Sequence, residues 1–87
     1  MYHVAVYDFT EKKVGKALKL FRRYLNWVQN SVFEGELTDS QFEELKKKVH
    51  KLIDPEVDSV IFYSLSNEKW LNRNIMGKEK NQINNFI

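Results

Sequence analysis

Runs of strand-forming residues alternate along this chain with two segments of helical spacing. Residues 2–8 and 57–65 are rich in β-branched and aromatic side chains, which predicts two strands. Apolar residues recur every three or four positions over residues 12–25 and 38–53, which predicts two helices. Residues 27–37, between the helices, predict a hairpin of two short strands. The order β-α-β-β-α-β predicts an α+β, ferredoxin-like sandwich with a four-stranded antiparallel sheet.

The hairpin is expected to turn at Asn30 and Ser31, because both residue types favour tight turns. Its strands are predicted at residues 27–29 and 32–34. Gly35 marks either a bulge or the end of the second strand.

Each helix carries an apolar stripe that is expected to face the sheet. The stripes comprise Val14, Ala17, Leu18, Phe21 and Leu25 in the first helix, and Phe42, Leu45, Val49, Leu52 and Ile53 in the second. Thr38 and Gln41 predict a capping box at the start of the second helix. Either Thr10 or Asp8 is expected to cap the first.

The last strand is apolar on both of its faces. Ile61 and Tyr63 point to one side, and Val60 and Phe62 point to the other. Two helices cover only one face of a four-stranded sheet, so the second face needs another cover. Since an 87-residue chain without cysteine has little else to stabilise it, a second copy is the economical cover. We therefore predict a homodimer whose sheets pack face to face.

The domain is predicted over residues 1–65. Residues 66–87 form a C-terminal tail, which we expect to hold one more short strand. The N-terminus lacks a basic signal region, and no apolar run reaches the ~18 residues of a membrane span. We therefore expect a cytoplasmic protein that does not bind membranes.

Positive charge is concentrated in the first predicted helix. Residues 11–25 hold six basic side chains against one acidic one, whereas the whole chain has a net charge of +2. The basic residues are Lys12, Lys13, Lys16, Lys19, Arg22 and Arg23. Phosphate groups of a nucleic acid would suit this surface, since lysine and arginine displace the counterions of phosphates. The alternative is a charged face that only keeps the protein in solution.

Asp8 is the principal candidate for chemistry, because it ends the first predicted strand, where sites on such sheets gather. The alternative is an Asx turn or a helix cap. A homodimer would supply two copies of Asp8, and two carboxylates with several waters form an acceptable Mg²⁺ site. Such an ion activates water and neutralises a phosphodiester. The common catalytic motifs GxSxG, GxxxxGK[ST], GxGxxG and HExxH are absent.

The segment RRYLNWVQNSVFEGEL, with VYDF before it and DPEVDSVIFY after it, closely resembles the family of small CRISPR-associated endoribonucleases. The resemblance implies a homodimer that works with two integrase dimers, as a heterohexameric complex, to acquire new spacers in antiviral defence. It also implies Mg²⁺-dependent cleavage of single-stranded RNA or double-stranded DNA, and a strand of the tail that pairs with the partner subunit. A non-catalytic scaffold that only binds the duplex is the alternative within the family.

The resemblance also implies roles for individual residues. Asp8 corresponds to the family's metal-binding aspartate, Tyr7 to the aromatic residue beside it, and Ser31 and Phe33 to a hairpin motif near the site. We accordingly predict catalytic roles for Asp8, Tyr7 and Ser31, and a dimer interface that includes Phe33 and Tyr63. A small-molecule regulatory domain of the same fold is a further alternative. It would be expected to have a glycine-rich loop after the first strand, and residues 9–13 contain no glycine.

Overall fold

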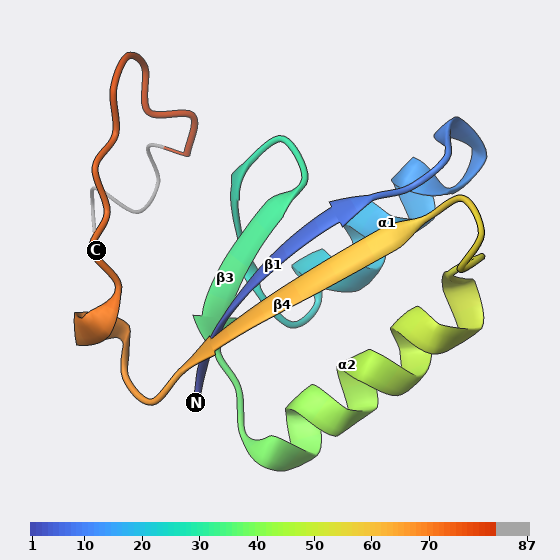
Figure 1. The fold of residues 1–87 in the computed structure, drawn as a ribbon, viewed down its shortest axis with the longest axis horizontal. Helices are drawn as coiled ribbons and strands as arrows, with labels where there is room; N and C mark the ends of the chain where they lie inside the picture. Colours follow the sequence, from blue (N-terminus) through green and yellow to red (C-terminus); the bar gives the residue numbers. More distant parts are fainter. Residues whose placement is uncertain (82–87) are drawn as a thin grey trace.

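The computed structural model describes residues 1–81 and confirms the predicted order of elements (Figure 1). The elements are β1 (Tyr2–Asp8), α1 (Glu11–Arg22), β2 (Asn26–Gln29), β3 (Val32–Glu36), α2 (Asp39–Leu52), β4 (Ser59–Leu65) and the 3₁₀ turn η1 (Glu68–Trp70). The four strands form one sheet in the order β2-β3-β1-β4, and every neighbouring pair is antiparallel. This is the predicted ferredoxin-like α+β fold.

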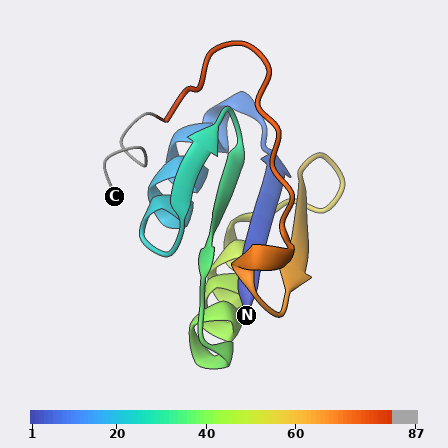
Figure 2. The same ribbon diagram turned by 90° about the vertical axis from the view of Figure 1, so that its left-hand side faces the viewer.

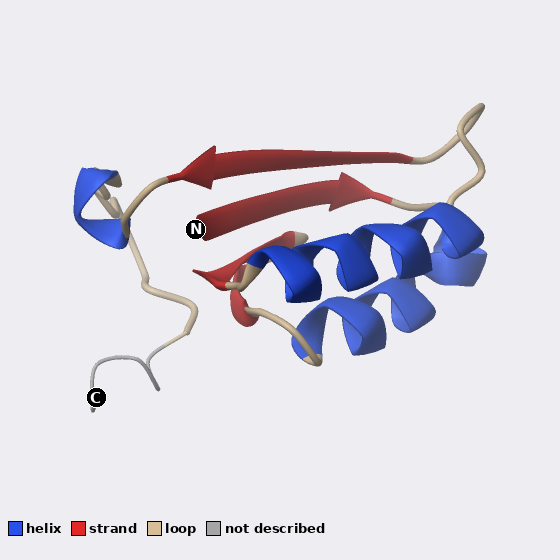
Figure 3. Cartoon of the chain, turned by 90° about the horizontal axis from the view of Figure 1, so that it is seen from below, coloured by secondary structure: helices blue, strands red, loops and turns tan. Residues whose placement is uncertain are grey.

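Both helices pack against the same face of the sheet, and no helix within residues 1–81 covers the other face (Figure 3). An aromatic cluster joins the two layers. The ring of Phe21, in α1, stacks on Tyr7 at 4.8 Å and on Phe33 at 5.8 Å between centroids. Phe21 and Phe33 are both fully buried. The cluster thereby fixes α1 across the centre of the sheet, directly beneath the end of β1.

The two helix starts are stabilised differently. The predicted capping box of α2 is confirmed, since Thr38 Oγ1 accepts from Gln41 N and Gln41 Oε1 accepts from Thr38 N. Thr10 occupies the N-cap position of α1, but its side chain makes no capping hydrogen bond there. Its backbone N–H instead donates to Oδ1 of Asp58, the residue just before β4.

Several predicted boundaries need correction. Helix α1 ends at Arg22 rather than at residue 25, because the chain turns there to bring Leu25 into the core before β2 begins. Strand β4 begins at Ser59 rather than at residue 57, and Val57 is exposed in the preceding turn. Val14 was placed in the buried stripe of α1, yet its side chain is 43% exposed.

The hairpin turns at Asn30 and Ser31 as predicted, and Asn30 adopts a left-handed conformation with φ of 45°. Gly35 marks neither a bulge nor the end of β3. It pairs with His3, and the irregularity lies in β2 between Trp27 and Gln29. A side chain at Gly35 would approach Leu25 to 3.3 Å, so close packing accounts for this glycine.

After β4 the chain crosses the end of the sheet towards the β2–β3 hairpin (Figures 1 and 2). Residues 66–81 contain η1 and no strand. The extra strand at a partner subunit thus stays a prediction, and residues 82–87 lie outside the described part of the chain. Two side chains attach the tail to the domain: Arg73 pairs with Glu34, and Asn81 donates to the carbonyl of Trp27.

Candidate nucleic-acid interface

Asp8 is the last residue of β1 and is exposed to solvent. It pairs with Ser59 on β4, and alternation along β1 points it to the face of the sheet that the helices leave open. Within residues 1–81, its carboxylate has no hydrogen-bond or ion-pair partner in this chain. Asp8 is therefore accessible to an ion or a nucleic acid.

Ser31 lies near Asp8, because the Ser31 carbonyl accepts a hydrogen bond of 3.1 Å from the backbone N–H of Tyr7. The Tyr7 side chain does not join them. It is 5% exposed and points into the helix layer, opposite to Asp8, since consecutive strand residues face opposite ways. Burial raises the pKa of the Tyr7 phenol. A direct catalytic role for Tyr7 does not fit this placement, whereas a role in supporting the end of β1 does.

The open face of the sheet is largely apolar. Ile61 is 49% exposed and Tyr63 is 56% exposed, beside Val6 and Val4 on the neighbouring strand. The prediction that Phe33 belongs to a dimer interface on this face is wrong. Phe33 pairs with Ala5 and shares its orientation towards the helices, where it is fully buried within its own chain.

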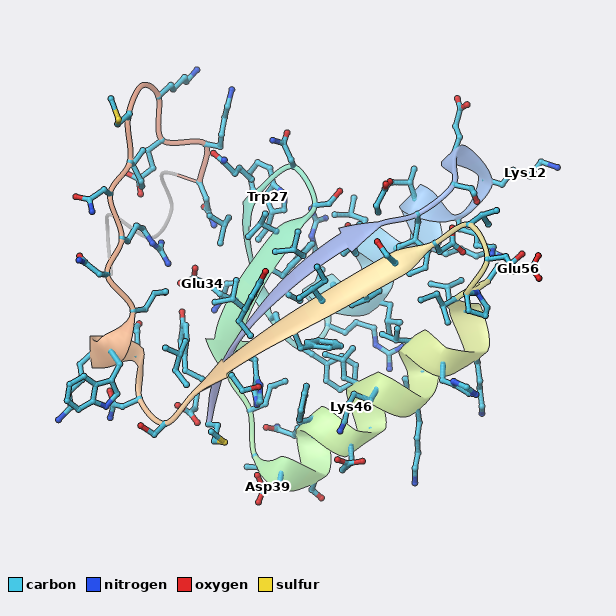
Figure 4. The ribbon with its side chains drawn as sticks, in the orientation of Figure 1. Lys12, Trp27, Glu34, Asp39, Lys46 and Glu56 are labelled. Carbon is cyan, nitrogen blue, oxygen red and sulfur yellow. The ribbon has the colours of Figure 1, made fainter. Side chains whose placement is uncertain are left out.

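The exposed basic residues of α1 form a single row. Lys12, Lys16, Lys19 and Arg23 are spaced by three or four positions, so they lie along the side of α1 opposite its buried residues. We call these four residues the basic row. It is roughly 16 Å long at the rise of an α-helix. Figure 4 shows Lys12, at one end of the row, extending away from the body of the domain.

The basic row is also unpaired among the described residues, in contrast to two of the four lysines of α2. In α2, Lys46 pairs with Glu43 and Lys48 pairs with Glu44. Among the described residues, the members of the basic row form no ion pair. Their positive charge is thus available to an external anion. Arg22 is exposed beside the row.

Lys13 was predicted to bind nucleic acid, but its ammonium is engaged inside the chain. Lys13 Nζ lies 2.8 Å from Oδ2 of Asp58, whose side chain is completely buried. The hydrogen bond from Lys13 holds the pKa of the Asp58 carboxyl below its usual range. The sequence analysis did not single out Asp58. The one available signal was a carboxylate at the start of an otherwise apolar strand.

A second internal site was also missed. The carboxylate of Glu34, in the middle of β3, accepts a 2.5 Å hydrogen bond from the Tyr2 hydroxyl and pairs with Arg73 of the tail. Figure 4 shows Glu34 on the side of the sheet where the tail runs. Burial raises the pKa of Tyr2 well above its ordinary value, and the hydrogen bond to Glu34 acts in the same direction.

No cluster of three or more His, Cys, Asp or Glu side chains that would suit a metal ion occurs within residues 1–81. The same part of the chain contains no helix able to cross a membrane. A cavity of about 240 Å³ lies between the hairpin and the tail, lined in part by Val28, Arg73 and Met76. Asp8 does not line it, so this cavity is separate from the site at the end of β1.

The element order and the one-sided helix layer place the chain among ferredoxin-like α+β proteins. Comparison with known proteins then gives the family. The protein-family model described as CRISPR associated protein Cas2 matches residues 1–73 of this chain. The chain belongs to this family of CRISPR-associated proteins.

Individual relatives agree with that assignment. The chain is 50% identical over 82 residues to the CRISPR-associated endoribonuclease Cas2 of Thermotoga maritima, covering 94% of each chain. It is 48% identical over 87 residues to the protein of the same name from Pyrococcus furiosus, covering both chains fully. Among solved structures, Streptococcus pyogenes Cas2 at pH 6.5 is 32% identical with a TM-score of 0.75, over 87% of this chain and 100% of that one. A further Cas2 crystal structure is 36% identical with a TM-score of 0.85, over 92% of this chain and 90% of the other.

Proposed function

We propose that this protein is a Mg²⁺-dependent endonuclease that acts as a homodimer in CRISPR adaptation. The observation that carries the proposal is the position of Asp8, which is exposed at the end of a central strand on the uncovered face of the sheet. The endoribonuclease names of its relatives support hydrolysis of a phosphodiester.

The dimer follows from the apolar open face. Burying Ile61, Tyr63 and their neighbours against a second copy would remove apolar surface from water, at about 25 cal/mol per Å². A two-fold axis that passes near the end of β1 would place one Asp8 from each subunit close together. Phe33 takes no part in this dimer interface, since it is buried between the sheet and the helices of its own chain.

The paired Asp8 carboxylates fit Mg²⁺, which commonly binds one or two carboxylates and retains several waters. A bound Mg²⁺ would supply a water of lowered pKa and neutralise charge on the scissile phosphate. Each subunit contributes an unpaired carboxylate, and Ser31, whose backbone carbonyl accepts from Tyr7 N next to Asp8, is assigned to orient a phosphate oxygen. One carboxylate alone is a poor site, so activity should depend on dimerisation.

The basic row would hold the nucleic-acid backbone on the helix side of the domain, opposite the sheet face that carries Asp8. Its four unpaired cations suit successive phosphates of single-stranded RNA or double-stranded DNA, without reading the base sequence. The same row supports a second candidate function, in which the dimer is a scaffold that holds the duplex for two integrase dimers in a heterohexameric complex. That role needs the basic row but does not need Asp8.

Replacing Asp8 with asparagine separates the two functions. Asp8→Asn removes the metal-binding charge and nearly preserves the shape of the side chain. We expect cleavage of RNA and duplex DNA in Mg²⁺ to be abolished, while the dimer and its duplex binding persist. Undiminished cleavage by the purified variant would reject the catalytic function and leave the scaffold as the function of the protein.

A further inference from the structure

The buried carboxylate of Asp58 joins three segments of the chain. Oδ1 accepts from Thr10 N at 2.9 Å, and Oδ2 accepts from Lys13 Nζ and from Asp54 N, both at 2.8 Å. Thr10 lies in the turn between β1 and α1, Lys13 in the first turn of α1, and Asp54 in the loop after α2. Asp58 is consequently the common acceptor for the segments that meet beyond the end of β1.

This acceptor lies next to Asp8 in the sheet. The last paired residues of β1 and β4 are Asp8 and Ser59, and Asp58 immediately precedes Ser59. The bond from Thr10 N to Asp58 therefore continues the connection between the two strands after the ladder ends. On the other side, Phe9 is buried in the core with its ring 5.4 Å from that of Tyr7. The turn that follows Asp8 is held from both directions.

Asp8 itself depends on this support. Since its carboxylate has no partner among residues 1–81, only the backbone of β1 and the following turn determines where it points. Mg²⁺ requires nearly ideal octahedral geometry, so a small displacement of a ligand weakens binding. Groups that orient a metal ligand typically contribute 10-fold to 100-fold in metal affinity or activity.

We propose that Asp58 is a positioning residue for Asp8, and that Lys13 belongs to this internal site and does not contact nucleic acid. The proposal rests on the nuclease function of Asp8 proposed above. Asp58 never touches the substrate or the metal; it fixes the turn that carries the catalytic carboxylate. Lys13 supplies the positive charge that keeps the buried carboxylate ionised.

The first test is Asp58→Asn, with Asp54→Asn as its matched control. In either orientation the asparagine NH₂ group faces a donor, Thr10 N or the pair Lys13 Nζ and Asp54 N, which disrupts the site. Within residues 1–81 the Asp54 side chain accepts from Glu56 N alone, and its backbone N–H is unaffected by the change. We expect the Mg²⁺ concentration for half-maximal cleavage to rise about 10-fold or more in Asp58→Asn, with the rate recovered at saturating Mg²⁺.

A defect of folding alone would lower the saturated rate and leave the Mg²⁺ midpoint unchanged. An Asp58→Asn midpoint equal to that of Asp54→Asn would overturn the proposal. Should Asp58→Asn fail to fold, Lys13→Met provides the same comparison, because it removes one of three bonds and leaves both backbone donors in place. Lys51→Met, at an exposed position on α2 outside the basic row, is its control.

The second test does not need cleavage, so it distinguishes failure of this proposal from failure of the nuclease function. Backbone order parameters of Phe9 and Thr10, measured by ¹⁵N relaxation, should fall from about 0.85 to below about 0.6 in Asp58→Asn. They should remain high in Asp54→Asn. Unchanged values in Asp58→Asn would reject the positioning role, even if Asp8→Asn had abolished cleavage.

Lys13 is tested by the salt dependence of duplex binding. Lys12→Met should reduce the slope of log affinity against log salt by about 0.9, the value for one phosphate contact. Lys13→Met should leave that slope unchanged, because its ammonium already pairs with Asp58. Equal reductions in the two variants would return Lys13 to the nucleic-acid surface.

Discussion

The imidazole of His3 stacks on the ring of Phe42 with centroids 3.9 Å apart, joining the central strand β1 to α2. His3 is 2% exposed, and its Nδ1 lies 2.8 Å from the hydroxyl of Ser64. Burial lowers the pKa of His3 below its ordinary value of 6.5, and the nearby N-terminal ammonium acts in the same direction. The folded protein therefore favours the neutral ring.

This burial predicts a loss of stability in mild acid. The unfolded chain takes up a proton near pH 6.5 while the folded chain does not, so the free energy of unfolding should fall as the pH drops below about 6.5. His3→Gln should reduce that dependence in urea unfolding at pH 7.5 and 5.0. His50→Gln, at an exposed position, is the control. If the free energy of unfolding depended equally on pH in His3→Gln and in the wild type, the acid sensitivity would not come from His3.

Arg73 is expected to stabilise the domain through Glu34. In Arg73→Met the buried carboxylate keeps its bond from Tyr2 but loses its cationic partner, which should lower the free energy of unfolding by about 1–3 kcal/mol. Adding Glu34→Gln should restore much of that loss. Lys78→Met is the control in the tail. An Arg73→Met variant as stable as the control would show that the pair contributes nothing measurable.

The basic row should govern duplex affinity and its salt dependence. Reversing the charge of Lys16 and Arg23 together is expected to weaken duplex binding. The slope of log affinity against log salt should also become flatter, by about the value for two phosphate contacts. Lys51→Glu changes charge at an exposed position on α2 and should have little effect. If the double variant keeps the wild-type slope, the row serves only to keep the protein in solution.

The open face should be required for dimerisation. Ile61→Asp with Tyr63→Asp places two charges where we propose apolar contact, so sedimentation should show a monomer at micromolar concentration. Val14→Asp places a charge on α1, at an apolar position about as exposed as Ile61, and should leave the dimer intact. A dimeric Ile61/Tyr63 variant would place the interface elsewhere and would remove the shared metal site.

The fold could be predicted from the sequence because its signals are local. Period-two alternation separated Ile61 and Tyr63 from Val60 and Phe62, and the Thr38–Gln41 spacing gave the start of α2. The β1–β4 register and the open apolar face also agree with the alternation seen in the sequence. Such patterns involve residues close together in the sequence, so they can be recognised without knowledge of the tertiary structure.

The internal partners of the site could not be predicted in the same way. Lys13 is 45 positions from Asp58, and only the packing of β4 beside β1 brings them together. By composition alone Lys13 is indistinguishable from Lys12, although one is paired inside the chain and the other is free. Phe33 was misplaced because the sequence motif gave its proximity to the site but not the face to which it points.

Metal stoichiometry tests the central claim most directly. Titration of the wild-type protein with Mn²⁺, followed by electron paramagnetic resonance, should show one tight ion for every two chains, because one ion is shared by two Asp8 carboxylates. Asp8→Asn should remove that ion while sedimentation still shows a dimer. One tight ion per single chain, or an ion retained in the Asp8→Asn dimer, would contradict a shared site at the end of β1.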